Sequence, residues 1–226
     1  MALDRTSAAR AGLALVSDVG LDSLTVRRLA GELGVRAPAL YWHFTDKRAL
    51  LDEMTQLLLA PVVAGLQPTP GPADQVWEWL EHALVAVHEA LGAQRDGARI
   101  AISAGIMSTP ALGTLLERVV GALHVAGFGL ADATRLAGLA LQLVVGRTAE
   151  EQTRPEPDAE LAIVNSDEFP YPLLAAGLRE RHTAGASVAD DFRYGVRVLI
   201  AGIRATAPTL NCAAATTPPP ATPPPR

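Results

Sequence analysis

Residues 24–44 read LTVRRLAGELGVRAPALYWHF, and this stretch decides the fold of the N-terminal part of the chain. Apolar residues recur at helical spacing from Val26 to Leu33, directly after Thr25, a residue type that caps helix N-termini well. Gly34 follows, at a point where a left-handed backbone costs little only for glycine. Pro38 then stands in the first turn of a short second helix, where its missing N–H is not needed. Two helices joined by so short a turn predict a helix-turn-helix.

The inward positions of this motif are Ala30, Val35 and Leu40, which are small or apolar where the helices must approach each other. A plain three-helix bundle would also bury aromatic residues such as those of the run 41–44, so that alternative stays open at this point. A fully buried run would leave the charge of Arg36 and the polar atoms of the run in need of partners. This favours a surface that meets DNA.

The outward positions supply the candidate DNA contacts. Arg36 is suited to a two-pronged hydrogen bond with guanine, worth about 1–3 kcal/mol of discrimination. Ala37 and Ala39 suit contact with thymine methyl groups, and hydroxyl, imidazole and ammonium groups nearby suit phosphates. The candidate DNA-binding residues are Thr25, Arg27, Arg36, Ala37, Ala39, Tyr41, Trp42, His43 and Lys47.

Outside this motif the chain also has the pattern of helices, so we predict an all-α fold. Helices are expected over 6–19 with Thr6 as N-cap, over 45–60 with Thr45 as N-cap, and over 73–91, 110–124, 130–151 and 188–205. The helix after Thr45 should end before Pro61. Residues 98–103 are mildly strand-like, and the proline-bearing stretch between 152 and 187 is interpreted as a loop with one short helix inside.

Breaks in composition divide the chain into three parts. We expect a helix-turn-helix domain over 1–46, a larger helical domain over 47–206, and a tail over 207–226 that contains TTPPPATPPPR. The tail's composition favours disordered polyproline II. The motif QPTPGP, residues 67–72, is a short linker inside the larger domain.

Composition narrows the classes of protein. Hydrophobic residues make up 49% of the 226 and charged residues 19%, which suits a packed core. The longest nearly uncharged apolar stretch, 137–146, is about half of what a membrane-spanning helix needs. The lone cysteine, Cys212, fits a reducing cytoplasm, and no signal-peptide core precedes the first helix. The usual hydrolase, zinc-protease and nucleotide-binding motifs are missing, so an enzyme is not expected.

Charge is unevenly distributed along the chain. The whole protein carries a net −5, yet residues 1–50 hold seven basic and five acidic side chains, against 12 and 19 in the remainder. Because a protein can meet phosphates with one face, this asymmetry is compatible with DNA binding, although a small excess of charge is common.

Beyond these patterns, the chain resembles the TetR family of bacterial repressors, and among them the tetracycline repressors. The most specific block is LYWHFTDKRALLDEM, residues 40–54, preceded by DVGLDSLTVRRLAGELGV at 18–35. The segments AQRDGARIAIS (93–103), VAGFGLADA (125–133), AEEQ (149–152), PYPLL (170–174) and FRYGVRVLIAGI (192–203) extend the resemblance to the larger domain. The resemblance implies a repressor that a small molecule releases from a near-palindromic operator.

The resemblance also implies a homodimer that places two reading helices in successive major grooves. The apolar patterns of 130–146 and 188–203 support a dimer interface built of four helices. A stripe of Val188, Phe192, Val196, Leu199 and Ile203 runs along the second of them. A helix in the centre of a monomeric core would show the same stripe and remains the alternative.

The candidate effector site departs from the resemblance. Tetracycline repressors bind a magnesium–drug chelate with a histidine where this chain has Ala101, while their acidic group is matched by Glu150. Val63, Ala83 and Val87 replace polar or aromatic drug contacts. We therefore expect an effector other than the chelate, with no metal and no cofactor, and a larger or more apolar ligand. The candidate effector-binding residues are Val63, His82, Ala83, Val87, Ala101, Ser103, His124, Gln142 and Glu150.

Some of these residues also suit structural roles that involve no ligand. His124 sits at a helix end and suits a capping role. Glu150 suits an ordinary solvated charge. A DNA-binding regulator or activator without a small-molecule switch is the alternative function.

Overall fold

The computed structural model describes residues 4–68, 72–154, 157–166, 168–185 and 187–208. Within these ranges the chain forms eleven α-helices and two 3₁₀ turns, and none of the described residues lies in a strand, which confirms the all-α prediction. The helices are α1 (Arg5–Val19), α2 (Val26–Glu32), α3 (Ala37–Tyr41), α4 (Lys47–Gly65), α5 (Val76–Gly92), α6 (Gly97–Ala101), α7 (Pro110–Val125), α8 (Leu130–Thr153), α9 (Pro157–Val164), α10 (Pro172–Thr183) and α11 (Val188–Ala205).

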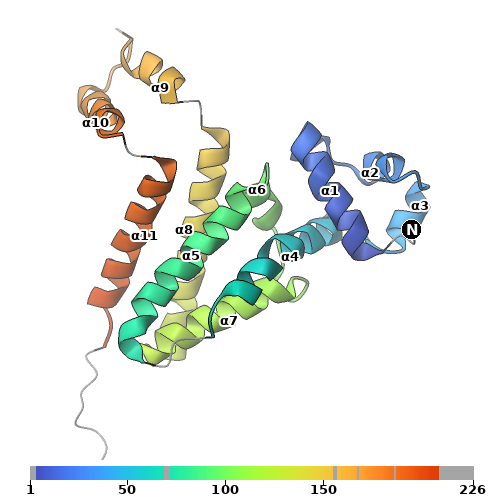
Figure 1. Ribbon diagram of the computed structural model, residues 1–226, viewed down its shortest axis with the longest axis horizontal. Helices are drawn as coiled ribbons and strands as arrows, with labels where there is room; N and C mark the ends of the chain where they lie inside the picture. The colour runs from blue at the N-terminus through green and yellow to red at the C-terminus, as the bar shows by residue number, and fades with distance from the viewer. Residues whose placement is uncertain (1–3, 69–71, 155–156, 167, 186, 209–226) are drawn as a thin grey trace, which may run out of the picture.

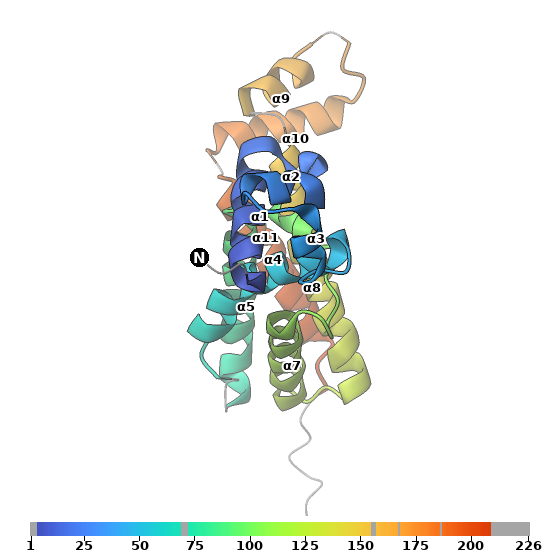
Figure 2. The same cartoon turned by 90° about the vertical axis from the view of Figure 1, so that its right-hand side faces the viewer.

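The helices form two packed units that share α4. We call α1–α3 the head and α5–α11 the body. Figure 1 shows the head at one end of the molecule and α11 at the opposite end, with α4 running from the head into the body. Turned by 90°, the head lies in front of the body while α9 and α10 stand at its upper end (Figure 2).

Two hydrophobic cores correspond to these units. The head core contains Leu29, Leu40 and Phe44, and it takes in Leu50 and Met54 from the first half of α4. The body core is built mainly on α5, α7, α8 and α11, and the second half of α4 joins it through one buried leucine, Leu59. Because one helix is buried in both cores, movement of α4 relative to the body must also move the head.

Two helix starts lie one or two residues away from the predicted caps. The N-cap of α1 is Asp4, not Thr6, and its carboxylate accepts a hydrogen bond from the amide of Ser7 at 2.7 Å. The N-cap of α4 is Asp46, not Thr45, with its carboxylate 2.8 Å from the amide of Ala49. A carboxylate is stabilised beside the positive end of the helix dipole, which the threonine hydroxyl cannot exploit as strongly.

Two further predictions about helix extent are wrong. α4 does not stop before Pro61 but continues through it to Gly65, since packing on both sides of the helix outweighs the one lost hydrogen bond. The stretch after α8 holds two helices, α9 and α10, instead of one. The mildly strand-like run at 98–103 begins inside the short helix α6, in keeping with the all-α prediction.

The predicted proline-rich tail lies, from residue 209 onward, outside the described residues. None of the helices described is long and apolar enough to cross a bilayer.

Candidate DNA-binding head and effector cavity

The turn between α2 and α3 has the geometry that the sequence predicts. Thr25 caps α2, with its hydroxyl accepting from the amide of Arg28 at 3.1 Å. Gly34 adopts a φ of 64°, and the next amide, that of Val35, donates to the carbonyl of Ala30 at 2.9 Å. Ala30 is buried, as expected for a close approach between the two helices. The head is therefore a helix-turn-helix with α3 as its second helix.

The candidate DNA contacts on α3 and just after it differ in exposure. Trp42 is 89% exposed and Tyr41 55% exposed, although both follow an apolar pattern that also suits a core. Arg36 is exposed at the start of α3, while Ala37, Ala39 and His43 are half-buried. A face with two aromatic rings in solvent is unusual for a self-contained bundle.

Three of the candidate contacts have roles inside the head as well. The Thr25 hydroxyl is the helix cap already described. The ammonium of Lys47 is exposed but lies 3.3 Å from the carbonyl of Leu21, to which it donates. The carbonyl of His43 accepts a hydrogen bond from the guanidinium of Arg5.

Arg5 fixes the end of α3 relative to α1 and α4. Besides its hydrogen bond to His43, its Nε lies 3.1 Å from a carboxylate oxygen of Glu53, and its guanidinium carbon lies 4.8 Å from the centre of the Phe44 ring. These contacts join α1 to the segment after α3 and to α4, and they hold the outer face in one orientation. Sequence reasoning did not find Arg5, because only the folded head brings residues 5, 43 and 53 together.

A cavity of about 240 Å³ opens within the body, between five helices. It is lined by Thr55 and Leu59 from α4, Val87 and Leu91 from α5, Ala101 from α6, Ile102 and Ala104 from the loop that follows, Leu112 from α7, and Leu141, Gln142, Val145 and Gly146 from α8. None of these residues is ionisable. Of the predicted effector-binding residues, the structure brings three to this cavity: Val87, Ala101 and Gln142.

The two polar residues of the cavity differ in how free they are. The hydroxyl of Thr55 donates to the carbonyl of Leu51 at 2.8 Å and lies 3.4 Å from that of Ile100. Gln142 is exposed, and its amide forms no side-chain hydrogen bond within the described part of the chain. Gln142 is therefore the polar side chain that remains available to a ligand.

The other six predicted effector residues do not line this cavity. Three of them lie elsewhere around α4 and α5. Ala83 is fully buried in the body core. His82 faces a different hollow, with Pro61 and Glu89, and Val63 packs against the core while its carbonyl accepts from Arg118.

The remaining three lie at other places outside the cavity. His124 is exposed near the end of α7, with its Nδ1 2.9 Å from the carbonyl of Phe128, which is the capping role. Ser103 lies in the loop after α6 and is half-buried outside the cavity lining. Glu150 is exposed and pairs with Arg147 at 2.7 Å. Among the described residues, no group of three or more His, Cys, Asp or Glu side chains is arranged to hold a metal ion.

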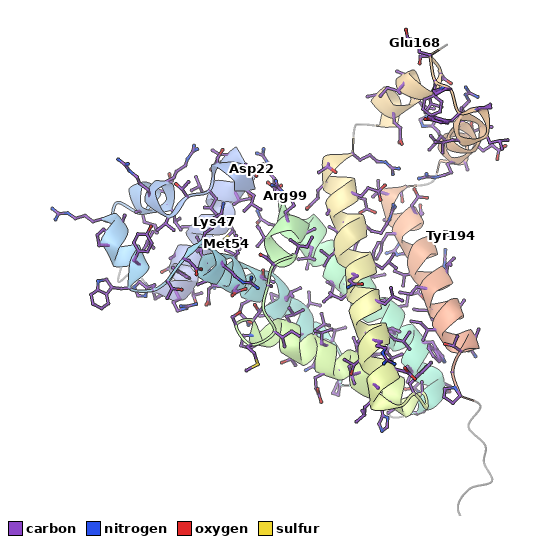
Figure 3. All side chains as sticks on the ribbon, turned by 180° about the vertical axis from the view of Figure 1, so that it is seen from behind. Asp22, Lys47, Met54, Arg99, Glu168 and Tyr194 are labelled. Carbon is purple, nitrogen blue, oxygen red and sulfur yellow. The ribbon has the colours of Figure 1, made fainter. Side chains whose placement is uncertain are left out.

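The short helix α6 touches both the cavity and the head. Ala101 lines the cavity, whereas the neighbouring Ile100 is fully buried in the head core. One residue before Ile100, the guanidinium of Arg99 lies 2.6 Å from the carboxylate of Asp22 in the head (Figure 3) and 2.8 Å from that of Asp96. Successive residues of one helix thus contact the two units.

Asp96 anchors this junction. It precedes α6 with a φ of 58°, a backbone conformation that aspartate tolerates better than most residues. Its carboxylate accepts from the amide of Leu21 at 2.8 Å. Burial alone would raise the pKa of Asp96, but the hydrogen bonds from Leu21 and Arg99 outweigh it, so the pKa lies below its usual value. The pKa of Asp22 is also lowered, first by the hydrogen bond from Arg99 and then by that residue's charge.

Two side chains of α4 form hydrogen bonds to the segment that joins α6 to α7, which forms another part of the cavity wall. The carboxylate of Asp52, which is buried, accepts from the amide of Gly105 at 3.1 Å. The amide oxygen of Gln56 accepts from the first free amide of α7, that of Ala111, at 2.7 Å. A change in the cavity wall at 101–112 therefore acts on α4 directly.

Family models match both units. The model described as "Bacterial regulatory proteins, tetR family" matches residues 9–54, and the one described as "Tetracyclin repressor-like, C-terminal domain" matches residues 69–207. The chain belongs to the TetR family. Its members are DNA-binding transcriptional regulators, and regulators of this kind are generally not enzymes.

Individual relatives agree with this membership. The tetracycline repressor protein class C of Escherichia coli is 34% identical over 214 residues, covering 92% of this chain and 94% of its own length. A possible TetR family transcriptional regulator from Streptomyces coelicolor A3(2) is 33% identical, with a TM-score of 0.77 and coverage of 89% and 99%. The structure of BioQ with its natural double-stranded DNA operator is 25% identical, with a TM-score of 0.64 and coverage of 90% and 99%.

In this TetR-family chain, most of the stripe on α11 that suggested a dimer interface is turned inward, whereas its first residue, Val188, is 46% exposed. Phe192, Val196 and Ile203 are buried in the body core, where α11 packs on α5 and α8. The apolar side chains left in solvent lie on a different face, with Tyr194 66% exposed and Val198 55% exposed. Figure 3 shows Tyr194 on the outer side of α11. The alternative of a helix in a monomeric core thus describes the predicted stripe, and any dimer contact must use the outer face.

A further cluster was missed by sequence reasoning. His88 on α5 lies 2.6 Å from the carboxylate of Glu151 on α8, and its ring stacks on that of Phe192 at 3.7 Å between centroids. Both polar side chains are nearly buried. The cluster ties α5, α8 and α11 together behind the cavity, and no spacing in the sequence brings residues 88, 151 and 192 together.

Proposed function

We propose that the protein is a transcriptional repressor that acts as a homodimer on a palindromic operator and is released by a small-molecule effector other than magnesium–tetracycline. The observation that carries the proposal is the position of α6, whose residue Ala101 lines the cavity while Ile100 belongs to the head core. A ligand that displaces α6 must disturb the head.

The head is the proposed reader of the operator. α3 enters the major groove with Arg36, Ala37 and Ala39 toward the bases. The sugar-phosphate backbone of the DNA on either side of the groove is contacted by the other candidates: Thr25, Arg27, Tyr41, Trp42, His43 and Lys47. The exposure of Tyr41 and Trp42 supports this, since aromatic rings left in solvent on a helix-turn-helix are accounted for by a surface that covers them. Residues 1–46 are thus the proposed DNA-binding domain and 47–206 the effector and dimer domain, with α4 shared.

A second copy is proposed to cover the outer face of α8 and α11. On α11 this face consists of Tyr194, Val198, Ala201, Gly202 and Ala205, all exposed and spaced at helical intervals. On α8 it includes Leu139, which is 49% exposed. These residues are apolar apart from the hydroxyl of Tyr194. α11 lies at the opposite end of the molecule from α3 (Figure 1). Two copies joined there would hold two heads apart, as a two-part operator requires.

Release of DNA is proposed to pass through the contacts of α6 and α4. A ligand between Ala101 and Leu112 displaces the segment that carries Gly105 and Ala111, which are bonded to Asp52 and Gln56 of α4. It also displaces Arg99 and so the pair with Asp22. The two heads of the dimer then change their spacing, and affinity for the operator falls.

We infer from the residues that line the cavity that the effector binds without a metal ion. A magnesium chelate needs oxygen or imidazole ligands, and the cavity offers only the amide of Gln142 and a hydroxyl already in use. Calorimetry with magnesium and tetracycline is expected to show no tight binding. Nanomolar binding would contradict this part of the proposal.

The experiment that tests the function begins with selection from a random duplex library. We expect a near-palindrome with half-sites about one DNA turn apart, bound more weakly as salt rises. Light scattering should give about twice the 23.7 kDa of one chain. Binding without sequence preference, or a mass of one chain, would contradict the proposal. Operator binding that no small molecule alters would favour a regulator without a switch.

A further inference from the structure

The cavity in the body has a composition that restricts its ligand. Ten of its twelve lining residues are apolar or glycine, and the other two are Thr55 and Gln142. Ionisable groups on the helices around the cavity already have partners: His88 pairs with Glu151, Glu150 pairs with Arg147, and the carboxylate of Asp52 accepts from the amide of Gly105. A charged group placed in this cavity would lose its hydration and find no opposite charge among the lining side chains.

The volume of the cavity sets the size of the ligand. A dry apolar cavity of about 150 Å³ accepts benzene. At about 240 Å³, this one has room for a body of two fused six-membered rings. Its lip is apolar too, because Ile102 lines the cavity and is 69% exposed. Of the two predicted departures from the magnesium chelate, a larger ligand or a more apolar one, the dimensions favour the second.

Gln142 supplies the one polar feature that a ligand can use. It stands on α8 at the exposed edge of the cavity, with its amide free to donate and to accept. The Thr55 hydroxyl lies at the inner side and already donates to a backbone carbonyl. A ligand should therefore carry its polar group on the side that faces α8.

We propose that the effector is an uncharged, mainly apolar molecule with a two-ring or equally sized body and one hydroxyl or carbonyl group that hydrogen-bonds Gln142. This inference rests on the proposed function, since it names the ligand class for the same cavity. It adds charge, size and the position of the polar group.

The test compares probes that share one ring system. Binding of 2-naphthol, naphthalene-2-sulfonate and 2-naphthylmethylammonium to the full chain is measured by calorimetry at pH 7 without DNA. We expect 2-naphthol to bind with a dissociation constant of about tens of micromolar, and both ions at least about tenfold more weakly. Equal or tighter binding of either ion, or no binding of 2-naphthol at about 1 mM, would overturn the inference.

Two variants test whether 2-naphthol binds in this cavity. Gly146 lines the cavity, and a Cβ added there meets no atom within 4 Å, so a leucine has room to narrow the cavity at this edge. Gly146→Leu should weaken 2-naphthol binding by at least about tenfold. Gly138→Leu is the matched control, because Gly138 lies on the same helix, has equally open surroundings and does not line the cavity. Equal loss in both variants, or in neither, would contradict the assignment to this cavity.

The role of Gln142 is read from a ratio of affinities. Wild-type protein should prefer 2-naphthol to naphthalene by about two- to tenfold, the gain from one hydrogen bond. In Gln142→Leu that preference should fall to about one, whatever the variant does to overall stability. An unchanged ratio would remove Gln142 from the site.

Failure of this inference can be told apart from failure of the proposed switch. If 2-naphthol binds as expected but leaves operator affinity unchanged, the ligand class stands and the switch falls. If an ion binds more tightly and releases the operator, the switch stands and the ligand class falls.

Discussion

The head and the cavity differ in how their functional residues are assembled. The proposed DNA contacts come from one continuous stretch, 25–47, in which a helix-turn-helix fixes every side chain relative to its neighbours. The cavity draws its residues from five helices and a loop between 55 and 146. A reading surface can thus be specified locally, whereas a ligand cavity is a property of the whole body. The consequence is that mutations on the surface of the head act at one contact, while mutations around the cavity act through the packing of several helices.

The largest expected effect is a loss of stability when a side chain is removed from the head core. Leu29 is fully buried in the head core, so Leu29→Ala should lower the free energy of unfolding by about 2–5 kcal/mol. Operator binding should weaken more than 2-naphthol binding, because Leu29 belongs to the head core while the cavity is lined mainly by helices of the body. Urea denaturation followed by circular dichroism, with calorimetry in parallel, measures both. Leu173→Ala is the control, because Leu173 is 89% exposed and should change stability by less than about 0.5 kcal/mol.

The next effect sharpens the assignment of α3. Arg36→Ala should cost about 1–3 kcal/mol of operator binding and relax the preference at one base position in each half-site. Stability should hardly change, because Arg36 is exposed. Fluorescence anisotropy on single-base variants of the selected operator measures the loss. Arg204→Ala, which removes an equal charge at the far end of α11, should bind as wild type, and an equal loss in both variants would show that only overall charge matters.

These two regions also differ in how far the sequence predicts them. Thr25, Gly34 and Pro38 act through local backbone preferences, and the structure confirms the elements they predict. Asp4 and Asp46 were missed as caps only because a threonine stood close to each. The prediction that the helix ends before Pro61 is wrong for a different reason. Contacts with residues far away in the sequence outweigh the local cost of a proline in a helix.

The cavity was harder to predict because nothing in a single helix distinguishes a residue beside a void from one in a packed core. Leu59, Leu91 and Leu112 follow the ordinary amphipathic pattern, yet each lines the cavity. Ala83 follows the same pattern and is buried in the core. Only the packing of five elements against one another decides which of these positions faces open space.

The smallest expected effect concerns the junction between the two regions. Asp96→Asn keeps the size of the side chain and a residue type that tolerates positive φ, and it removes the charge that faces Arg99. At neutral pH the loss of stability should stay under about 1 kcal/mol, since Arg99 is partly exposed.

The contribution of Asp96 to stability should be clearer when the pH is lowered. The pKa of Asp96 in the folded protein lies below its value of 3.8 in the unfolded chain, so its contribution is fully present well above that value and is lost as pH falls through the lower, folded pKa. Between about pH 6 and pH 3, wild type should therefore lose more stability than Asp96→Asn. Urea denaturation at the two pH values gives the difference. An identical loss in both proteins would mean that the carboxylate does not stabilise the junction.

The central claim is that α6 couples the cavity to the head, and reciprocity tests it most directly. A ligand that weakens operator binding must itself bind more weakly to the operator complex, by the same factor. The measurement is the affinity of 2-naphthol for the free protein and for the protein saturated with the selected operator. The account predicts binding about fivefold or more weaker in the complex, and a smaller ratio in Arg99→Gln, which loses the contact with Asp22. Equal affinities for free and DNA-bound protein would contradict it.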